Sequence, residues 1–240
     1  MTTERPTALL FDVFGTVVDW RGSVMRDLQD FFEPRQISRD WETFALDWRA
    51  LYQPAMEQVR SGARPYAILD ILHRENLDEL LRRYDIDGLD DRDRDQLTML
   101  WHRLDPWPDS SAGLRRLRKA FWNAPVSNGN TALMINLARH GGFVWDTILG
   151  ADTARNFKPR PEVYLKSATA LGLPPAACMM VAAHNDDLTA AANLGFQTAF
   201  VCRPFEYGPK QTADTKADRE WTHAVSSLTE LADRLVGPEV

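Results

Sequence analysis

Four short clusters of polar residues in this 240-residue chain are candidates for chemistry. They combine a carboxylate before a tight turn, hydroxyl and amide donors, a lysine, and two adjacent carboxylates, which together suit covalent or acid–base catalysis. In chain order the clusters are Asp12-Val13-Phe14-Gly15-Thr16, Ser127-Asn128-Gly129-Asn130, Lys158-Pro159-Arg160-Pro161-Glu162-Val163-Tyr164 and His184-Asn185-Asp186-Asp187.

The first cluster places a carboxylate where it could act as a nucleophile. Asp12 ends the apolar run of residues 7–12, which is typical of a buried strand. Gly15 allows the chain to turn there, and turn amides with the Thr16 hydroxyl could hold the carboxylate ionised. The alternative is that Asp12 only caps the segment that follows.

Each of the other clusters also has a plain structural interpretation. Ser127 and Asn128 could donate to an anion or could simply start a helix. Lys158 could keep nearby carboxylates ionised and place an anionic substrate, or could be a solvated surface residue. Asp186 and Asp187 could serve in acid–base or metal chemistry, or could be the acidic first turn of a helix.

The elements around the clusters alternate between strands and helices. Strands are predicted over residues 7–12, 121–127, 147–150, 179–183, 197–202 and 223–225, and helices over 110–119, 131–140, 160–171, 187–194 and a last segment ending near 236. This alternation predicts an α/β fold with a doubly wound parallel sheet, in which ligands bind beyond the carboxyl ends of the strands. Residues 22–104, with helical periodicity over 39–60 and 66–84, predict an all-helical insertion after the first strand.

Composition excludes several other classes. A net charge of −6 argues against a nucleic-acid partner, and no apolar run is long enough to span a membrane. Cys178 and Cys202 lack metal-ligand spacing and are expected to be small buried hydrophobes in a reducing compartment. No cofactor is indicated. The expected location is the cytoplasm, because the first residues do not form a signal peptide.

The order of the four clusters resembles that of the haloacid dehalogenase superfamily over nearly the whole chain. This resemblance implies a Rossmann-like core domain over residues 1–20 and 105–240 and a helical cap domain over 21–104. Within the superfamily, the chain looks most like the L-2-haloacid dehalogenases, because Tyr164 follows Lys158 by six residues and Trp48-Arg49 is similar to the cap arginine of that family. Similar proteins are commonly homodimers.

Phe14 selects between two reactions of the superfamily. Most members are magnesium-dependent phosphatases with a second Asp at this position, which protonates the leaving alkoxide. A phenylalanine can neither give nor accept a proton, whereas halide leaves without one. The predicted activity is therefore hydrolytic dehalogenation of a small 2-haloalkanoic acid through an ester on Asp12. The alternative is a phosphatase for a small phosphorylated metabolite.

The resemblance also implies roles for the individual residues. Lys158, Ser127 and Thr16 would keep Asp12 anionic, and Asp187 would orient or deprotonate the hydrolytic water, assisted by Asn185 and His184. Arg49 and Asn128 would hold the substrate carboxylate and the halide, next to Tyr164 and a dry pocket formed by aromatic side chains that include Phe14 and Trp20.

The fourth cluster departs from the family pattern of Ser-Ser-Asn-x-x-Asp. Ala182 replaces the first Ser and His184 replaces the Asn, while Asp187 keeps the final carboxylate. His184 is expected to lie in the active site and could titrate near neutral pH, with a packing role as the alternative. The pair Asp186 and Asp187 leaves a metal ion open as an alternative.

Overall fold

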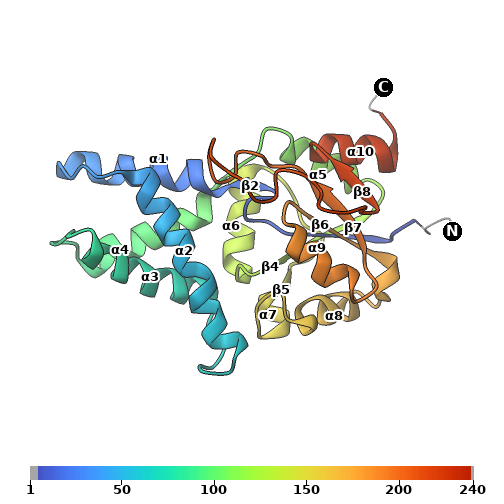
Figure 1. Cartoon of the computed structure of the whole chain (residues 1–240), viewed down its shortest axis with the longest axis horizontal. Helices are drawn as coiled ribbons and strands as arrows, with labels where there is room; N and C mark the ends of the chain where they lie inside the picture. The colour runs from blue at the N-terminus through green and yellow to red at the C-terminus, as the bar shows by residue number, and fades with distance from the viewer. Residues whose placement is uncertain (1–4, 239–240) are drawn as a thin grey trace.

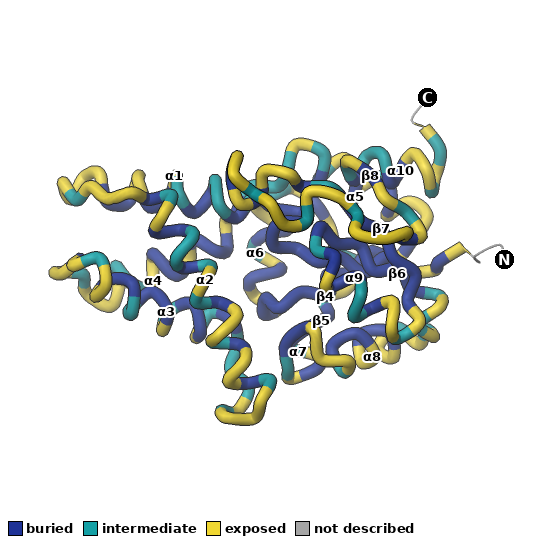
Figure 2. Tube along the Cα trace, in the orientation of Figure 1, coloured by how far each residue is buried: buried dark blue, intermediate teal, exposed yellow. Residues whose placement is uncertain are grey.

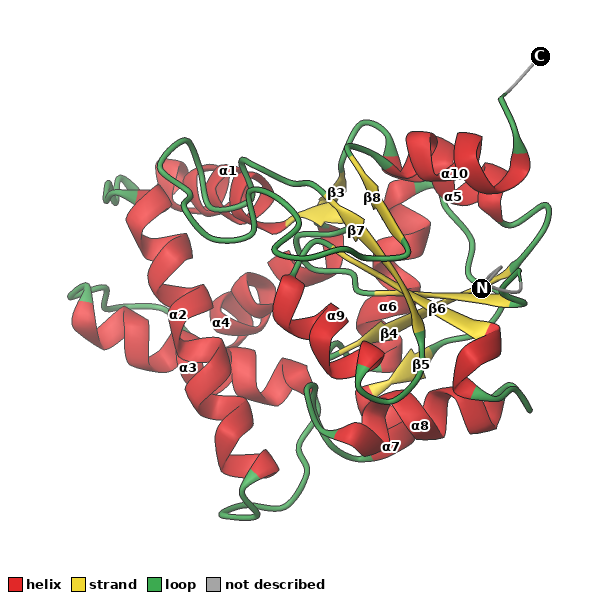
Figure 3. Ribbon diagram, turned by 45° about the vertical axis from the view of Figure 1, so that its right-hand side comes forward, coloured by secondary structure: helices red, strands yellow, loops and turns green. Residues whose placement is uncertain are grey.

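The computed structural model describes residues 5–238, which form a six-stranded parallel sheet with helices on both faces (Figures 1 and 3). The strand order is β5-β4-β1-β6-β7-β8, so β1 lies in the interior of the sheet. The strands are β1 (Ala8–Phe11), β4 (Trp122–Ser127), β5 (Leu149–Gly150), β6 (Cys178–Ala182), β7 (Gln197–Val201) and β8 (His223–Val225). The predicted doubly wound α/β fold is confirmed.

Alternation along the strands explains why both faces are covered. In β1, Leu9 and Phe11 enter one hydrophobic cluster, while Ala8 and Leu10 enter a second. Successive side chains of a strand point to opposite faces, and every residue of β1 is fully buried, so each face needs its own layer of helices. Figure 2 shows the strands as buried segments between more exposed helices.

The helices divide between these two clusters. Buried side chains of α5 (Ser110–Leu117), α6 (Thr131–Gly141) and α10 (Leu228–Val236) enter the first cluster, and those of α8 (Pro161–Ala170) and α9 (Asn185–Ala192) enter the second. The short helix α7 (Ala151–Ala154) contributes Ala151 to the first cluster and Ala154 to the second. Helix α7 was not predicted from the sequence, because four residues are too few for a helical period to show. The other predicted helices of this part of the chain are present, with their ends shifted by a few residues.

Residues 20–103 form helices joined by loops, without a strand. They comprise α1 (Trp20–Phe32), α2 (Trp41–Arg60), α3 (Leu69–Arg83), α4 (Asp91–Thr98) and the 3-10 turns η1 (Glu33–Arg35) and η2 (Met99–Arg103). Helices α1–α4 lie together at one end of the molecule, away from both termini (Figure 1). Two short strands, β2 (Val18–Asp19) and β3 (Asp105–Pro106), pair antiparallel where the chain leaves and re-enters the sheet region. The domain limits of 20/21 and 104/105 stay a prediction.

Polar contacts hold the helical insertion against the sheet region. Asp70 accepts from Asn130 Nδ2 at 2.9 Å, and His102, whose Nε2 pairs with Asp70, contacts Asn136 Nδ2 of α6 through its Nδ1 at 2.9 Å. At the far end of α2, the Arg60 guanidinium donates to the Lys158 carbonyl at 2.7 Å. These contacts fix the insertion above the carboxyl ends of β1 and β4, where the first two polar clusters lie.

Two further observations concern the chain as a whole. None of the helices described is long and apolar enough to cross a membrane. Both cysteines are free, and Cys178 is buried as predicted. The prediction that Cys202 is buried was wrong: it is only partly buried, because it lies beyond the end of β7, where its Sγ contacts the Thr215 carbonyl.

Candidate active site

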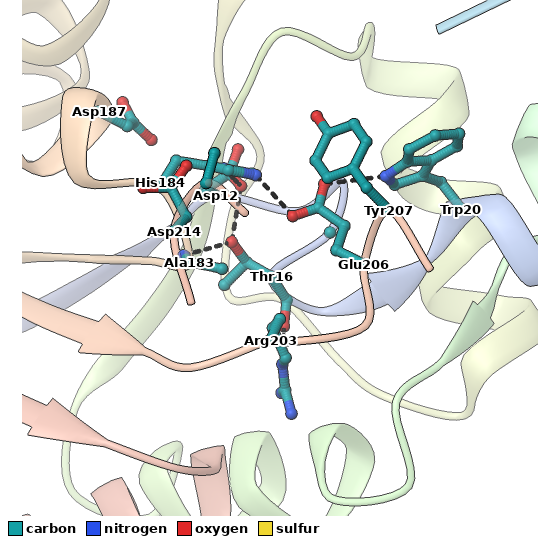
Figure 4. Close-up of polar contacts among 12 residues, drawn as sticks. Asp12, Thr16, Trp20, Ala183, His184, Asp187, Arg203, Glu206, Tyr207 and Asp214 are labelled. Atoms are coloured by element: carbon teal, nitrogen blue, oxygen red, sulfur yellow. Dashed lines mark hydrogen bonds and ion pairs between the residues drawn. The ribbon is translucent and has the colours of Figure 1, made fainter. Parts of the chain in front are cut away.

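The polar clusters converge at the carboxyl ends of the strands. Asp12 follows β1 and His184 follows β6, and these strands are neighbours in the sheet. A cavity of about 310 Å³ opens over them. Its lining residues from the four sequence clusters are Asp12, Asn128, Lys158, Pro159, Tyr164, His184, Asp186 and Asp187. Figure 4 shows Asp12 and His184 close together, with Thr16 beside them.

Asp12 is almost completely buried but is held by charged partners. Lys158 Nζ donates to Oδ1 at 2.8 Å, the Thr16 hydroxyl donates to Oδ2 at 2.7 Å, and His184 Nδ1 lies 3.2 Å from Oδ2. Burial would raise the pKa of Asp12, but the positive charges of Lys158 and His184 outweigh it and hold this pKa far below its usual range. The Thr16 hydroxyl is itself fixed, since it accepts from the Ala183 backbone amide at 2.9 Å. Asp12 is therefore an oriented, ionised carboxylate.

Lys158 bridges two carboxylates. Its Nζ also donates to Asp187 Oδ2 at 2.6 Å, and the Tyr164 hydroxyl donates to Asp187 Oδ1. Burial opposes the charge on Lys158, yet Asp12 and Asp187 together raise the pKa of this ammonium. Burial raises the pKa of Asp187, and the neighbouring charge of Asp12 acts in the same direction. The Lys158 and Tyr164 spacing seen in the sequence therefore places both side chains on one carboxylate.

A residue outside the four clusters completes the site. Glu206 has 1% of its surface exposed; it accepts from His184 Nε2 at 2.9 Å and from Trp20 Nε1 at 2.9 Å (Figure 4). Its carboxylate lies so close to Gly15 that a Cβ there would come within 2.1 Å of Glu206 Oε1. Sequence analysis missed Glu206. The sequence feature that could have identified it is its position after β7, the parallel strand next to β6 in the sheet.

The helical insertion supplies a cation to the cavity. Arg49, on α2, lies over the Tyr52 ring with its Cζ 4.1 Å from the centroid, and both residues line the cavity. Its Nη1 is buried and has no hydrogen-bond partner within the described part of the chain. Two other arginines of the insertion are engaged elsewhere: Arg39 bonds backbone carbonyls at the end of α3, and Arg60 bonds Gln53 and Glu57. The structure thus favours Arg49 as the arginine that faces a ligand.

Several predicted site residues lie behind the cavity wall rather than on it. Ser127 is fully buried and accepts from the Gly129 amide. Asn185 is turned away: its side chain bonds Asp214, Lys216, Asp218 and Trp221. Trp20 and Phe14 are buried, and the Phe14 ring packs edge-on against Tyr52 and Trp101. These residues support the site, while Tyr207 and Asp214, which sequence analysis did not single out, line it.

The arrangement does not suit a divalent cation shared by the two carboxylates. The Lys158 ammonium lies between Asp12 and Asp187, within 2.8 Å of both, and neutralises them there. Within residues 5–238, no three His, Cys, Asp or Glu side chains are gathered so that they could hold a metal ion.

A family model described as haloacid dehalogenase-like hydrolase matches residues 6–195. This chain belongs to that family. It is 29% identical over 229 residues to (S)-2-haloacid dehalogenase 4A of Burkholderia cepacia, a match that covers 93% of this chain and 92% of the relative. Among solved structures it is similar to the defluorinating L-2-haloacid dehalogenase Rha0230, with a TM-score of 0.94, 45% identity, and coverage of 96% of this chain and 95% of the other. A second L-2-haloacid dehalogenase, PA0810, gives a TM-score of 0.93 and 44% identity, with coverage of 96% and 99%. The resemblance drawn from the four clusters is confirmed.

Proposed function

We propose that this haloacid dehalogenase-like hydrolase converts a small 2-haloalkanoic acid to the 2-hydroxy acid through an ester on Asp12. One observation carries the proposal. A buried, ionised carboxylate opens onto a small cavity to which the helical insertion contributes Arg49, whose Nη1 has no hydrogen-bond partner among residues 5–238. A nucleophile and an anion-binding guanidinium at one cavity are what an anionic alkyl halide requires. The names of the relatives agree with this substrate class.

The residue that could have protonated a leaving group is missing. Phe14 occupies the position two residues after Asp12, and its ring is 2% exposed within the aromatic cluster. Phosphate-ester cleavage expels an alkoxide, which needs a proton, whereas halide departs as a stable anion. The side chain at position 14 therefore favours dehalogenation over phosphatase activity.

The first step is displacement at C2. An oxygen of Asp12 attacks C2 in line with the carbon–halogen bond, the C–O bond forms as halide leaves, and a chiral centre is inverted. Lys158 and Thr16 hold Asp12 in its reactive ionised form, and removal of water from the buried carboxylate strengthens it as a nucleophile. Arg49 and the side-chain amide of Asn128 hold the substrate carboxylate and the departing halide. Asp187 keeps Lys158 in place.

In the second step, water attacks Cγ of the Asp12 ester and releases the 2-hydroxy acid. Haloacetates and 2-halopropionates suit a cavity of about 310 Å³, which is at the small end for ligand sites. We include fluoroacetate in the proposed range, because the 45%-identical relative is named a defluorinating enzyme.

The test measures fluoride, chloride and bromide release from a panel of 2-haloacids, with and without a chelator. In a single turnover in labelled water with enzyme in excess, heavy oxygen should enter Asp12, and Asp12→Asn should abolish halide release. Inertness toward every haloacid, together with vigorous Mg²⁺-stimulated cleavage of a chromogenic phosphate, would replace this function by the phosphatase alternative.

A further inference from the structure

His184 lies between two buried carboxylates. Its Nδ1 is 3.2 Å from Asp12 Oδ2 and its Nε2 is 2.9 Å from Glu206 Oε2. Either neutral tautomer would turn a ring lone pair toward a carboxylate oxygen, so two ionised carboxylates at these positions favour the imidazolium in the resting site. Burial opposes that charge, but Glu206 and Asp12 together raise the pKa of His184 well above its ordinary value.

Glu206 is built into the site as the partner of His184. Its carboxylate is 1% exposed and accepts from His184 Nε2 and Trp20 Nε1. Gly15 leaves the space that this carboxylate occupies. A nearly desolvated carboxylate that contacts one ring nitrogen orients an imidazole and stabilises its protonated form, whatever the surrounding fold.

The charges facing His184 come from several elements and alternate in sign. Asp12 follows β1 and Glu206 follows β7. Beyond Asp12 lies Lys158, and Arg49 on α2 interacts electrostatically with Glu206. Asp214 lines the same cavity from the loop before β8. Conversion of Asp12 to a neutral ester would remove the anion nearest to Nδ1 and leave Glu206 at Nε2.

We propose that His184 is the proton acceptor for hydrolysis of the Asp12 ester and that Glu206 is its positioning residue. This inference rests on the proposed function and deepens it. Asp187 is poorly placed for the task, because one of its oxygens already accepts from Lys158 and the other from Tyr164. His184 Nδ1, in contrast, faces the carboxylate that becomes the ester.

The protons balance over the cycle. When Asp12 displaces halide and becomes a neutral ester, His184 releases its Nδ1 proton to solvent. The Nε2 proton stays on the ring, held by its hydrogen bond to Glu206. Water then attacks Cγ and gives one proton to Nδ1. As the tetrahedral intermediate collapses, the bond between Cγ and the substrate oxygen breaks and that proton passes to the alkoxide. The remaining proton of the water moves from the Asp12 carboxyl to His184, which restores the carboxylate–imidazolium pair. The sum is haloacid plus water giving hydroxy acid, halide and one proton.

The experiment separates the two half-reactions by rapid quench with 2-chloropropionate, counting halide per active site, and by intact mass of the quenched protein. Wild type should turn over without accumulating an adduct. His184→Asn and Glu206→Gln should still release about one halide per site in the first turnover, and the alkylated protein should then accumulate. The rate of later turnovers should fall by about 10²–10⁴-fold in His184→Asn and by about 10-fold or more in Glu206→Gln. His140→Asn is the matched control, because His140 also pairs with a carboxylate, Asp105, at 2.8 Å, but on the exposed surface; it should behave as wild type.

A small-molecule base and a pH series give readouts that a merely structural role would not move. Added imidazole should accelerate decay of the adduct in His184→Gly. In wild type the adduct should begin to accumulate as pH falls, because the acceptor becomes protonated and ester hydrolysis slows. Loss of the first halide together with turnover in both His184→Asn and Glu206→Gln, or accumulation of the adduct in neither, would overturn the proposal. A wild-type protein that releases no halide from any haloacid would instead overturn the proposed function.

Discussion

Replacement of Lys158 by Met tests the electrostatics on which the site depends. The Lys158 ammonium contacts both Asp12 and Asp187, so these two carboxylate oxygens lie roughly 5 Å apart. Two unit charges at about 5 Å repel by about 3 kcal/mol at an effective dielectric constant of about 20. This corresponds to about two pKa units for the pair, before the cost of burial is added.

Two effects should follow in Lys158→Met. Removing one partner of a buried ion pair costs about 3–5 kcal/mol, so the free energy of unfolding at pH 7 should fall by about that amount. In the wild type, the lowered pKa of Asp12 stabilises the fold above the pKa of the unfolded chain, and this contribution is lost only as pH falls through the lower folded-state pKa. Without Lys158 the pair takes up a proton at higher pH, so the acid limb of kcat/KM for halide release should move up by about two pH units or more.

The assays are urea unfolding followed by tryptophan fluorescence, and initial rates of halide release between pH 4 and 10. Lys166→Met is the control, because Lys166 lies on α8 close to the site in sequence but is exposed. An unchanged acid limb in Lys158→Met, with activity retained at pH 5, would show that Lys158 does not hold Asp12 ionised and would refute the reasoning.

Three other predictions use the same variants and assays. Gly15→Ala should destabilise the fold by about 2 kcal/mol or more and abolish turnover, because the new Cβ meets Glu206 and the backbone there has φ +83°. Gly62→Ala is the control: its φ is +80° but the space around it is open, so thermal unfolding should show only the cost of the backbone conformation. Arg49→Met should lower kcat/KM for haloacids by about 10²–10³-fold, since two charge-assisted hydrogen bonds contribute about 3–4 kcal/mol, and an unchanged KM and kcat would remove Arg49 from the substrate site. The raised pKa of His184 stabilises the fold at pH values below the unfolded pKa of about 6.5, and this contribution disappears as pH rises through the folded-state pKa. The difference in free energy of unfolding between wild type and His184→Gln should therefore shrink from pH 6 to pH 9. A constant difference in urea unfolding would contradict this prediction.

Local pattern was sufficient for the residues that depend on chain neighbours. Strand β1 was predicted because its residues are all apolar, and Asp12 was found because it ends that run. Tyr164 was found through its spacing from Lys158, since both flank the start of α8. Phe14 favoured dehalogenation over phosphatase activity, because the side chain two residues after Asp12 is set by the sequence itself.

Other features required the packed molecule. The sequence pointed to Arg49 only through its resemblance to the cap arginine of the family, and the packing of α2 is what brings Arg49 to the cavity and engages Arg39 and Arg60 elsewhere. In the sequence, the Asn185 side-chain amide has the chemistry needed to bind a catalytic water. In the folded chain its hydrogen-bonding groups are engaged by residues 214–221.

The division follows from the range of the interactions. The order of strands and helices, the position of Asp12 at the end of a strand and the lack of a proton donor at Phe14 were determined by the sequence, because hydrophobic periodicity and motif spacing act within a few residues. The contact between His184 and Glu206, 22 residues apart, was decided only by the tertiary structure. It exists because parallel pairing brings the ends of β1, β6 and β7 to one edge of the sheet, and the space above Gly15 there is open to a buried carboxylate.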